Sequence, residues 1–205
     1  MSNTKRLLCC LFLVIFASSA FSQSSEYKKS IEDCYSTVEF RKERYKNKHE
    51  QECYIDLKLP EFELLTMDGE LINNESFKGK ITVINFWFAA CPPCIAEIPG
   101  LNTVSKKYSP DEVSFIAAST DSYDEMERFL KKKGSFGFEI APNASDIFFK
   151  TFHIQSGFPT TIIVDEEGII QYFISGGLAD FRAARKIRKK LCSALDKMLK
   201  DKEVN

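Results

Sequence analysis

Two cysteines separated by two prolines, Cys91-Pro92-Pro93-Cys94, carry the clearest chemistry in this chain. They follow an apolar run, residues 81–88, and precede a stretch whose pattern predicts a helix. Thiols at a helix N-terminus lie in the field of unpaired backbone amides, which favours the thiolate form. A Cys-x-x-Cys pair in this setting is typical of a redox motif rather than of a structural bridge.

The two cysteines are expected to have different tasks. Cys91, at the start of the helix and nearer the solvent, is predicted to be the thiolate that attacks a substrate disulfide. Cys94, about one turn further along, would then attack Cys91 and release the reduced substrate. Because neither Pro92 nor Pro93 has an N–H, the Cys91 thiolate loses two backbone donors. We therefore predict a modestly activated Cys91 and a reducing pair.

Metal binding is the competing interpretation of the two thiols. A zinc site needs two further ligands, and the sequence has no second Cys-x-x-Cys and no His-x-x-x-His. A non-enzymatic Cu(I) chaperone, with Cys91, Cys94 and either His49 or His153 as ligands, is an alternative. Since a lone histidine is more often structural, the sequence favours a redox site without metal or other cofactor.

Hydrophobic patterning predicts the elements that position the dithiol. The run at 81–88 has little alternation, which is typical of a buried strand, and the helix after it should reach about Tyr108 with a kink at Pro99. Strands that alternate with helices indicate an α/β sheet covered on both faces. The further expected elements are a strand at 62–66, a strand at 113–119, a helix at 123–133 ended by Gly134, a short helix near 146–152, a hairpin of 160–165 with 169–175, and an amphipathic helix from Leu178 to Met198.

The first 22 residues predict export. Lys5 and Arg6 precede an apolar segment, 7–17, that is too short to span a bilayer comfortably. Small residues before Gln23 make a plausible cleavage site. We interpret residues 1–22 as a cleaved signal peptide, with an uncleaved membrane anchor as the alternative. The protein is then periplasmic or otherwise exported.

Export changes how the remaining cysteines are interpreted, because disulfides persist outside the cytosol. Cys34 and Cys53 are candidates for a structural disulfide that the sequence alone does not prove. Cys192 is left over and lies beside the apolar stripe of the last helix, so a buried, inert thiol is expected.

Charge and composition limit the other partners. The formal net charge is −1, and basic residues are interspersed with acidic ones, which argues against nucleic acid. The one basic cluster, 182–190, is interpreted as the solvated face of a helix. Residues 23–57 are polar, with loose helical spacing, and are predicted to be an extension or linker before a domain at 58–205.

Several short motifs together resemble the TlpA/ResA-like thiol-disulfide oxidoreductases of the thioredoxin superfamily. The resemblance covers roughly residues 58–200 and implies a thioredoxin-like fold. That fold is a central mixed β-sheet flanked by helices, with an added N-terminal hairpin and a central insert, for which 120–155 is the natural place. The motifs are Asn85-Phe86-Trp87, Cys91-Pro92-Pro93-Cys94, Glu97-Ile98-Pro99 and Phe158-Pro159-Thr160.

The resemblance also implies roles for single residues. Glu97 corresponds to an active-site glutamate that accepts the Cys94 proton, while Asn85 stands where many thioredoxins have a buried Asp. Pro159 corresponds to a proline opposite the dithiol that is usually cis, and the Phe158 backbone is expected to pair with an extended substrate. The predicted catalytic residues are thus Cys91, Cys94 and Glu97, and the predicted substrate-binding residues are Trp87, Pro92, Phe158 and Pro159.

The leading functional hypothesis is an exported disulfide reductase. It would reduce disulfides of exported proteins, with a cytochrome c maturation role among the options, and would receive electrons from a membrane thiol-disulfide donor. A disulfide oxidant or isomerase is the alternative that shares the site. A peroxidase is disfavoured because Phe88 stands where a threonine is wanted, three residues before the first cysteine.

Overall fold

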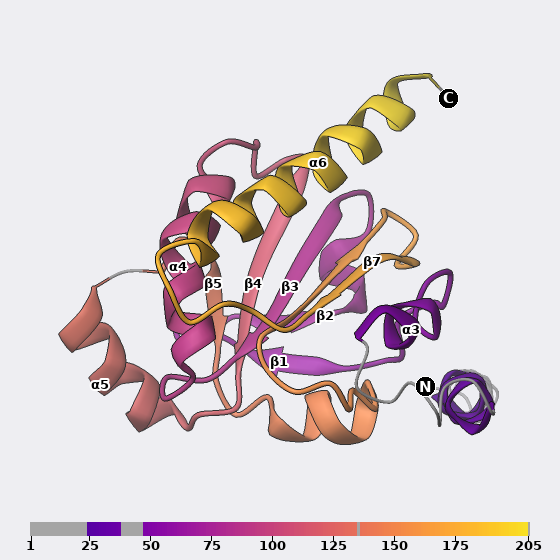
Figure 1. Ribbon diagram of the computed structural model, residues 1–205, viewed down its shortest axis with the longest axis horizontal. Coiled ribbons are helices and arrows are strands. Elements are labelled where there is room, and N and C mark those ends of the chain that lie inside the picture. The colour runs from indigo at the N-terminus through magenta and orange to yellow at the C-terminus, as the bar shows by residue number, and fades with distance from the viewer. Residues whose placement is uncertain (1–23, 38–46, 135, 205) are drawn as a thin grey trace, which may run out of the picture.

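A five-stranded mixed sheet forms the centre of the computed structural model, which describes residues 24–37, 47–134 and 136–204 (Figure 1). Strand β4 pairs in parallel with β3 and β5, whereas β6 pairs antiparallel with β3 and β7. This is the predicted mixed sheet. In spatial order the strands are β5 (Glu139–Ala141), β4 (Val113–Ser119), β3 (Ile81–Trp87), β6 (Thr160–Val164) and β7 (Ile170–Ser175).

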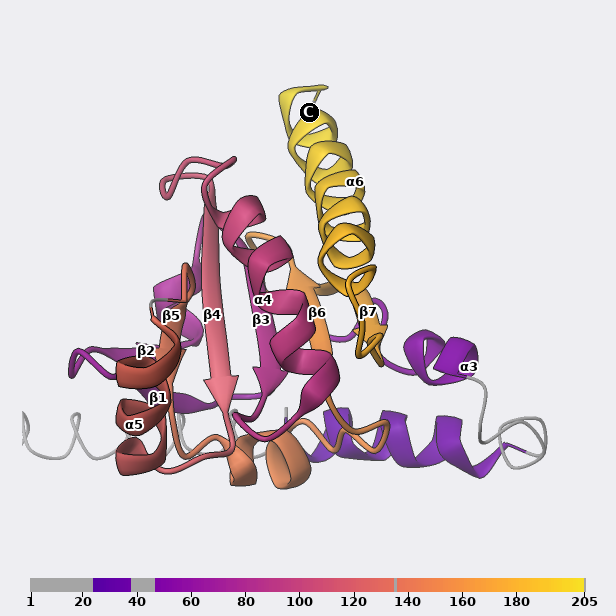
Figure 2. The ribbon, with the colours of Figure 1, turned by 60° about the vertical axis from the view of Figure 1, so that its left-hand side comes forward.

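Helices and a separate two-stranded hairpin surround this sheet (Figure 2). The hairpin, β1 with β2, is the predicted N-terminal addition, and α5, β5 and η2 occupy the predicted insert. The remaining elements are a helix over 24–36, α3 (Asn47–Glu52), β1 (Glu63–Leu65), β2 (Leu71–Asn73), η1 (Asn74–Phe77), α4 (Pro92–Ser105), α5 (Tyr123–Lys133), η2 (Ile147–Thr151, a π-helix) and α6 (Ala183–Val204).

The position of β3 at the centre of the sheet explains why its sequence is mostly apolar. All seven of its residues are buried. Ile84 and Phe86 belong to one hydrophobic cluster, while Val83 and Trp87 belong to a second on the other face of the sheet. Because successive side chains of a strand point to opposite faces, a strand covered on both sides carries apolar residues on both faces, and β3 has only Thr82 and Asn85 as polar exceptions.

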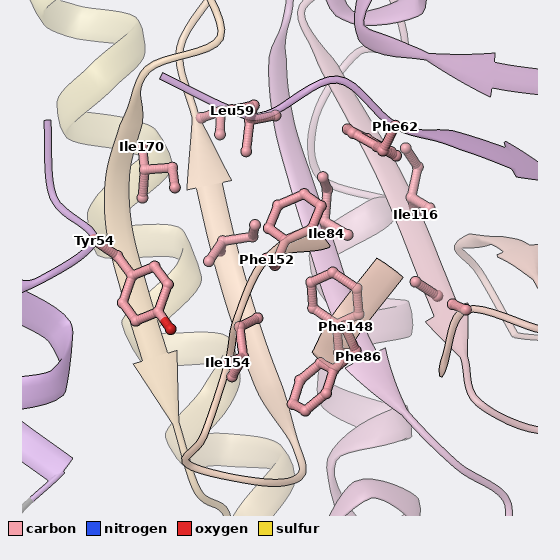
Figure 3. Close-up of a cluster of buried hydrophobic side chains, with 14 of the residues drawn as sticks. Tyr54, Leu59, Phe62, Ile84, Phe86, Ile116, Phe148, Phe152, Ile154 and Ile170 are labelled. Carbon is pink, nitrogen blue, oxygen red and sulfur yellow. The ribbon is translucent and has the colours of Figure 1, made fainter. Parts of the chain in front are cut away.

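The first cluster contains the described part of the N-terminal extension. Tyr27 and Ile31 from the helix over 24–36, together with Tyr54, pack with the sheet and with Phe152 of the segment after η2. Figure 3 shows Tyr54 and Phe152 beside the side chains of the sheet in this cluster. The segment predicted to be an extension or linker therefore contributes buried side chains to the same core as residues 58–205.

The second cluster lies under α4, α5 and α6, and a glycine sets the distance between two of these helices. A Cβ atom on Gly100 of α4 would lie 2.2 Å from the carbonyl oxygen of Ala184 in α6. Only a residue without a side chain permits this approach. The close crossing places the first turn of α6 against the middle of α4, about one turn beyond Glu97.

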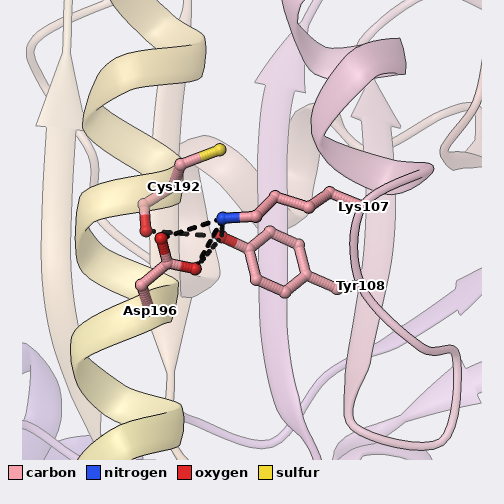
Figure 4. Close-up of polar contacts among 4 residues, drawn as sticks. All are labelled: Lys107, Tyr108, Cys192 and Asp196. Carbon is pink, nitrogen blue, oxygen red and sulfur yellow. Dashed lines mark hydrogen bonds and ion pairs between the residues drawn. The ribbon is translucent and has the colours of Figure 1, made fainter.

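A polar cluster holds the C-terminal half of α6 against the end of α4 (Figure 4). The Tyr108 hydroxyl donates to Asp196 at 2.7 Å, and the Lys107 ammonium binds the same carboxylate at 2.7 and 2.8 Å. These hydrogen bonds lower the pKa of Asp196, and the bond from Lys107 makes the largest contribution. Helix α6 is thus fixed at two points along α4.

Most predicted boundaries agree with the structure. Helix α5 has the predicted bounds because Ser122 and Glu125 form a capping box at its start and Gly134, with a φ of +86°, ends it. Helix α4 continues through Pro99 but ends at Ser105 rather than near Tyr108.

The beginning of the last helix was predicted wrongly. Helix α6 begins at Ala183, so Leu178 and Phe181 precede it, and Phe181 is 92% exposed. A loop with the ion pair between Asp180 and Arg182 stands there instead. The prediction that Cys192 is buried is also inexact, because this free thiol is half-buried.

Candidate active site

Cys91 and Cys94 form a disulfide at the N-terminus of α4, with their Cα atoms 5.3 Å apart. Cys91 is the N-cap residue, and its Sγ accepts a hydrogen bond from the Cys94 amide at 3.3 Å. Pro92 and Pro93 occupy the first two helical positions. The first turn therefore offers the Cys91 sulfur a single amide, that of Cys94.

The two cysteines do not differ in exposure in this oxidised form. Cys91 and Cys94 are each 3% exposed, and both pack in the second hydrophobic cluster. The expectation that Cys91 lies nearer the solvent is thus wrong for the disulfide state. Pro92, by contrast, is exposed at the protein surface.

An aspartate that the sequence analysis did not single out holds the loop before the dithiol. One carboxylate oxygen of Asp121 accepts the amide of Ala89 at 2.7 Å and the hydroxyl of Ser119 at 2.8 Å. Asp121 follows the strand that pairs in parallel with β3, so both loops leave the same edge of the sheet. A polar residue just after a neighbouring parallel strand is the sequence signal for it.

Three parts of the chain converge on Gly177, in the loop after β7. A Cβ atom on Gly177 would lie 2.9 Å from Oε1 of Glu97, 3.0 Å from Cγ of Pro159 and 3.2 Å from Cβ of Pro93. The register explains the convergence, because the end of β3, the start of β6 and the end of β7 are neighbours in the sheet. Glycine keeps this space open for the glutamate.

Glu97 is a buried carboxyl group beside the dithiol. Its side chain is 5% exposed, and burial raises its pKa to about 7. Lys190 and Lys186 of α6 oppose this shift through their positive charges. Such a group titrates near neutral pH, which is where a proton acceptor is most effective. The sequence analysis assigned both lysines to a solvated helix face and missed their contribution to the pKa of Glu97.

Aromatic side chains cluster around Phe158, next to the dithiol. Its ring stacks on Phe148 at 4.3 Å and meets Phe88 edge-on at 5.2 Å. Phe149, 6.2 Å away, is 53% exposed. The Phe158–Pro159 peptide bond is cis, as the resemblance implied. These rings give the neighbourhood of the dithiol an apolar surface.

Trp87 does not form part of this surface. Its side chain is 1% exposed and packs between Phe129 and Phe136, with ring centroids 5.2 Å away in both cases. The placement of Trp87 among substrate-binding residues is therefore corrected: it supports the cluster that contains the cysteines. Its position on β3 points it under α4 and α5 rather than outward.

Asn85 is also buried, at 2% exposure, and has a fixed partner. Its side-chain amide donates to the Thr161 hydroxyl across the β3–β6 pair at 2.8 Å. An amide does not titrate, so Glu97 is the buried carboxyl group nearest the motif in the chain that can exchange a proton.

The N-terminal segment supports the loop that precedes Pro159. Oε1 of Glu50 accepts the amides of Gln155 and Ser156 at 3.2 and 2.9 Å, and it also accepts the Tyr35 hydroxyl at 2.9 Å. A disulfide joins Cys34, next to Tyr35 in the chain, to Cys53, three residues after Glu50, with Cα atoms 5.7 Å apart. Sequence reasoning named the two cysteines but missed Glu50, which no local motif marks.

No metal centre or membrane-spanning helix is present in the described part of the chain. Among residues 24–37, 47–134 and 136–204, no group of three or more His, Cys, Asp and Glu side chains is placed to hold a metal ion. Within the same residues, no helix is long and apolar enough to cross a membrane. The predicted signal peptide, 1–22, and its cleavage site lie outside them.

Comparisons with known proteins show the family to which this chain belongs. The family model described as "AhpC/TSA family" matches residues 55–173. The protein named thiol-disulfide oxidoreductase ResA of Bacillus thuringiensis subsp. konkukian is 29% identical over 127 residues, covering 62% of this chain and 73% of that protein. The thioredoxin-like protein YneN of Bacillus subtilis is 31% identical over 115 residues, which cover 55% of this chain and 66% of the length of YneN.

Solved structures with a similar fold include StoA of Bacillus subtilis, with 25% identity and a TM-score of 0.50 over 63% of this chain and 94% of that one. A thioredoxin family thiol:disulfide interchange protein of Chlorobium tepidum has 25% identity and a TM-score of 0.55. The match covers 67% of this chain and 95% of the Chlorobium chain. The predicted thioredoxin-like fold is confirmed.

Proposed function

The chain belongs to the AhpC/TSA family, and from this premise we propose that its Cys91–Cys94 dithiol reduces disulfides in exported proteins. The chemistry is that of a thiol-disulfide oxidoreductase of the ResA type. The position of Cys91 at the N-cap of α4, with the Cys94 amide on its sulfur, is the observation that supports the role of Cys91 as nucleophile.

The reaction proceeds in two exchange steps. In the reduced protein the Cys91 thiolate attacks one sulfur of the substrate disulfide, forms a mixed disulfide and releases the other sulfur as a thiolate. The Cys94 thiolate then attacks the Cys91 sulfur and releases the second substrate thiolate. Two electrons pass from the dithiol to the substrate, whose thiolates take up two protons, and the Cys91–Cys94 disulfide remains.

Glu97 accepts the proton of Cys94 in the second step. Cys94 must lose its proton before it attacks, and a carboxylate one turn along α4 accepts it. A pKa of about 7 leaves Glu97 partly ionised at neutral pH, so it can accept that proton and later return it to solvent. Its Oε1 lies next to Gly177, where Pro159 and Pro93 also approach, which supports its place beside the dithiol.

The substrate segment is proposed to bind at Pro159. An extended chain would pair with the backbone of Phe158, and an apolar side chain of that segment would contact the aromatic rings of Phe149 and Phe158. Pro92, exposed at the start of α4, borders the same entry to the disulfide.

The direction of electron flow is tested by the equilibrium potential of the dithiol against a glutathione or dithiothreitol series. We expect a value nearer ~−270 mV, typical of a reductant, than ~−120 mV, typical of a strong oxidant. A value at the oxidising end would establish the alternative, a disulfide-forming enzyme.

Export and the source of electrons complete the proposal. Residues 1–22 have the composition of a signal peptide, and outside the cytosol the oxidised dithiol needs a membrane thiol-disulfide donor to become reduced again. Replacement of Cys94 by serine traps mixed disulfides on Cys91. Isolation of these complexes from the exported fraction identifies substrates, including any apocytochrome c, and their absence there contradicts the proposal.

A further inference from the structure

A cavity of about 630 Å³ lies away from the dithiol, between α6, β7 and the segment that follows α3. We call it the α6 groove. Figure 1 shows α6 crossing the sheet with β7 and α3 to one side. Its apolar wall is formed by Ile55, Tyr172 and Ile174. The volume is in the range of cavities that bind small ligands, about 300–1,000 Å³.

Four lysines of α6 line the other wall: Lys186, Lys189, Lys190 and Lys197. Their spacing of three, four and seven residues places them on one face of the helix. None of them forms an ion pair or hydrogen bond with any residue in the described part of the chain. Like charges along one helix face repel each other, so an anion bound among them relieves that repulsion.

The groove combines an apolar wall with a positively charged one. The acidic side chain among its lining residues, Glu52, lies on the opposite side from the lysines, on α3. An apolar group would be removed from water by Ile55, Tyr172 and Ile174, while an anionic group would meet the ammonium groups of α6. The segment 38–46 of this chain is not a suitable occupant of the groove. It has four basic and two acidic residues, so its charge does not complement that of the lysines.

We propose that the α6 groove binds an anionic amphiphile, a small molecule with a carboxylate-type head and an apolar tail. The tail packs on the wall formed by Ile55, Tyr172 and Ile174, and the head group binds between Lys186 and Lys190. An acidic segment of a protein is a different occupant, with no apolar tail to fill the cavity.

The same two lysines connect the groove to the active site. Lys190 and Lys186 are the groups whose positive charges lower the pKa of Glu97, against the larger effect of its burial. Burial and the charge of Lys186 lower the pKa of Lys190, and the charge of Glu97 opposes this shift. A bound anion offsets the charge of both lysines, so it is expected to shift the pKa of Glu97 upward. This consequence rests on the proposed role of Glu97, whereas binding itself does not.

Calorimetry with sodium dodecanoate below its micelle concentration tests the site on the full oxidised chain. We expect saturable binding of one molecule per chain and at least tenfold weaker binding of dodecyltrimethylammonium, which has the same tail and the opposite charge. The double variant Lys186→Gln/Lys190→Gln should bind dodecanoate at least tenfold more weakly. Lys131→Gln, on α5 outside the groove, is the matched control and should bind like the parent.

The apolar wall is tested separately by Ile174→Thr, which keeps the β-branched shape of this strand residue and adds a polar group. We expect this variant also to bind dodecanoate more weakly. A cooperative urea unfolding transition would show that the variant is folded. Non-saturable binding, equal affinity for both amphiphiles, or equal affinity of the double lysine variant would overturn the proposal. So would binding to anionic phospholipid vesicles or to an acidic peptide without binding of monomeric dodecanoate.

The link to Glu97 has its own measurement. Infrared titration of the Glu97 carboxyl group, assigned with Glu97→Gln, should show a higher pKa when dodecanoate is bound. If dodecanoate binds but leaves this pKa unchanged, the coupling is refuted while the binding site stands. If the parent protein binds dodecanoate in calorimetry but does not reduce insulin, the proposed function is refuted while the binding site stands.

Discussion

The carboxylate of Glu50 accepts the backbone amide of Ser156 at 2.9 Å, across 106 residues of sequence. It joins the N-terminal segment to the loop that leads into Phe158 and Pro159. Glu50 is only 6% exposed and accepts two further hydrogen bonds, from Gln155 and from the Tyr35 hydroxyl. The segment ahead of the thioredoxin-like strands therefore helps to shape the proposed substrate site.

Replacement of Glu50 by alanine is expected to weaken both the fold and substrate binding. It leaves the partly buried amide hydrogen bonds of Gln155 and Ser156 without their acceptor, which should lower the free energy of unfolding by about 1–3 kcal/mol. It also frees the loop before Pro159, so KM for a disulfide substrate should rise more than kcat falls. Urea unfolding and insulin reduction measure the two effects. Glu32→Ala, on the exposed face of the helix over 24–36, is the control; equal behaviour of the two variants would contradict the role of Glu50.

Removal of the Cys34–Cys53 disulfide should destabilise the protein by about 3 kcal/mol. The estimate follows from the entropy that a cross-link across 19 residues removes from the unfolded chain. Thermal unfolding of the double variant Cys34→Ser/Cys53→Ser under oxidising conditions measures it. Cys192→Ser, which removes the free thiol, should leave stability within about 0.5 kcal/mol. If both proteins unfold alike, the bond does not stabilise the native state.

Glu97→Gln should slow the resolving step in which Cys94 attacks Cys91. Loss of a positioned proton acceptor typically costs about 100-fold or more in rate. Stopped-flow decay of a preformed mixed disulfide on Cys91, followed from pH 5 to 9, isolates this step. The parent rate should rise with pH through about 7, the pKa of Glu97, and the variant should lack that transition. A shared transition would assign it to another group.

The same variant should have a pH-dependent effect on stability. Burial raises the pKa of Glu97 above its unfolded value, so the ionised carboxylate is disfavoured in the folded protein. The stability associated with its protonated form is complete below about pH 4.5 and is lost as the pH rises through about 7. Relative to the parent, Glu97→Gln should therefore gain stability over this interval, by roughly 3 kcal/mol at most. Urea unfolding at pH 4 and 8 measures the difference, with Glu61→Gln, at an exposed site, as the control.

Pro93→Ala is expected to make the dithiol more oxidising. It restores an amide at the second position of α4, where a donor would stabilise the reduced Cys91 thiolate and lower its pKa. The potential should rise by about 30 mV or more, a tenfold change in the equilibrium constant. Alkylation rates against pH and glutathione equilibration measure the two quantities. Pro99→Ala, in the interior of the same helix, should change neither; an equal shift in both variants would mean that the helix as a whole has changed.

Gly100→Ala should separate α4 from α6. The added methyl group meets the backbone of Ala184, which has no rotamer to adjust, so we expect a loss of at least about 1–3 kcal/mol. Thr103→Ala, on the exposed side of α4, is the control and should unfold nearly as the parent does. Because α6 carries Lys186 and Lys190, their distance from Glu97 should grow and its pKa should rise. A stable Gly100→Ala protein with an unchanged Glu97 pKa would contradict the proposed packing.

The sequence by itself determined the dithiol, the strand before it, the bounds of α5 and the thioredoxin-like class, because each depends on local patterns: apolar runs, capping residues and a short motif. The burial of Trp87 and of both cysteines, the meeting of Glu97, Pro159 and Pro93 at Gly177, and the contacts of Asp121 and Glu50 were decided by tertiary structure. They join residues that are far apart in the chain, and spacing along a sequence does not encode which strand ends become neighbours. The pKa of Glu97 belongs to the second group, since burial raises it and two lysines of α6, about ninety residues later in the chain, oppose that shift.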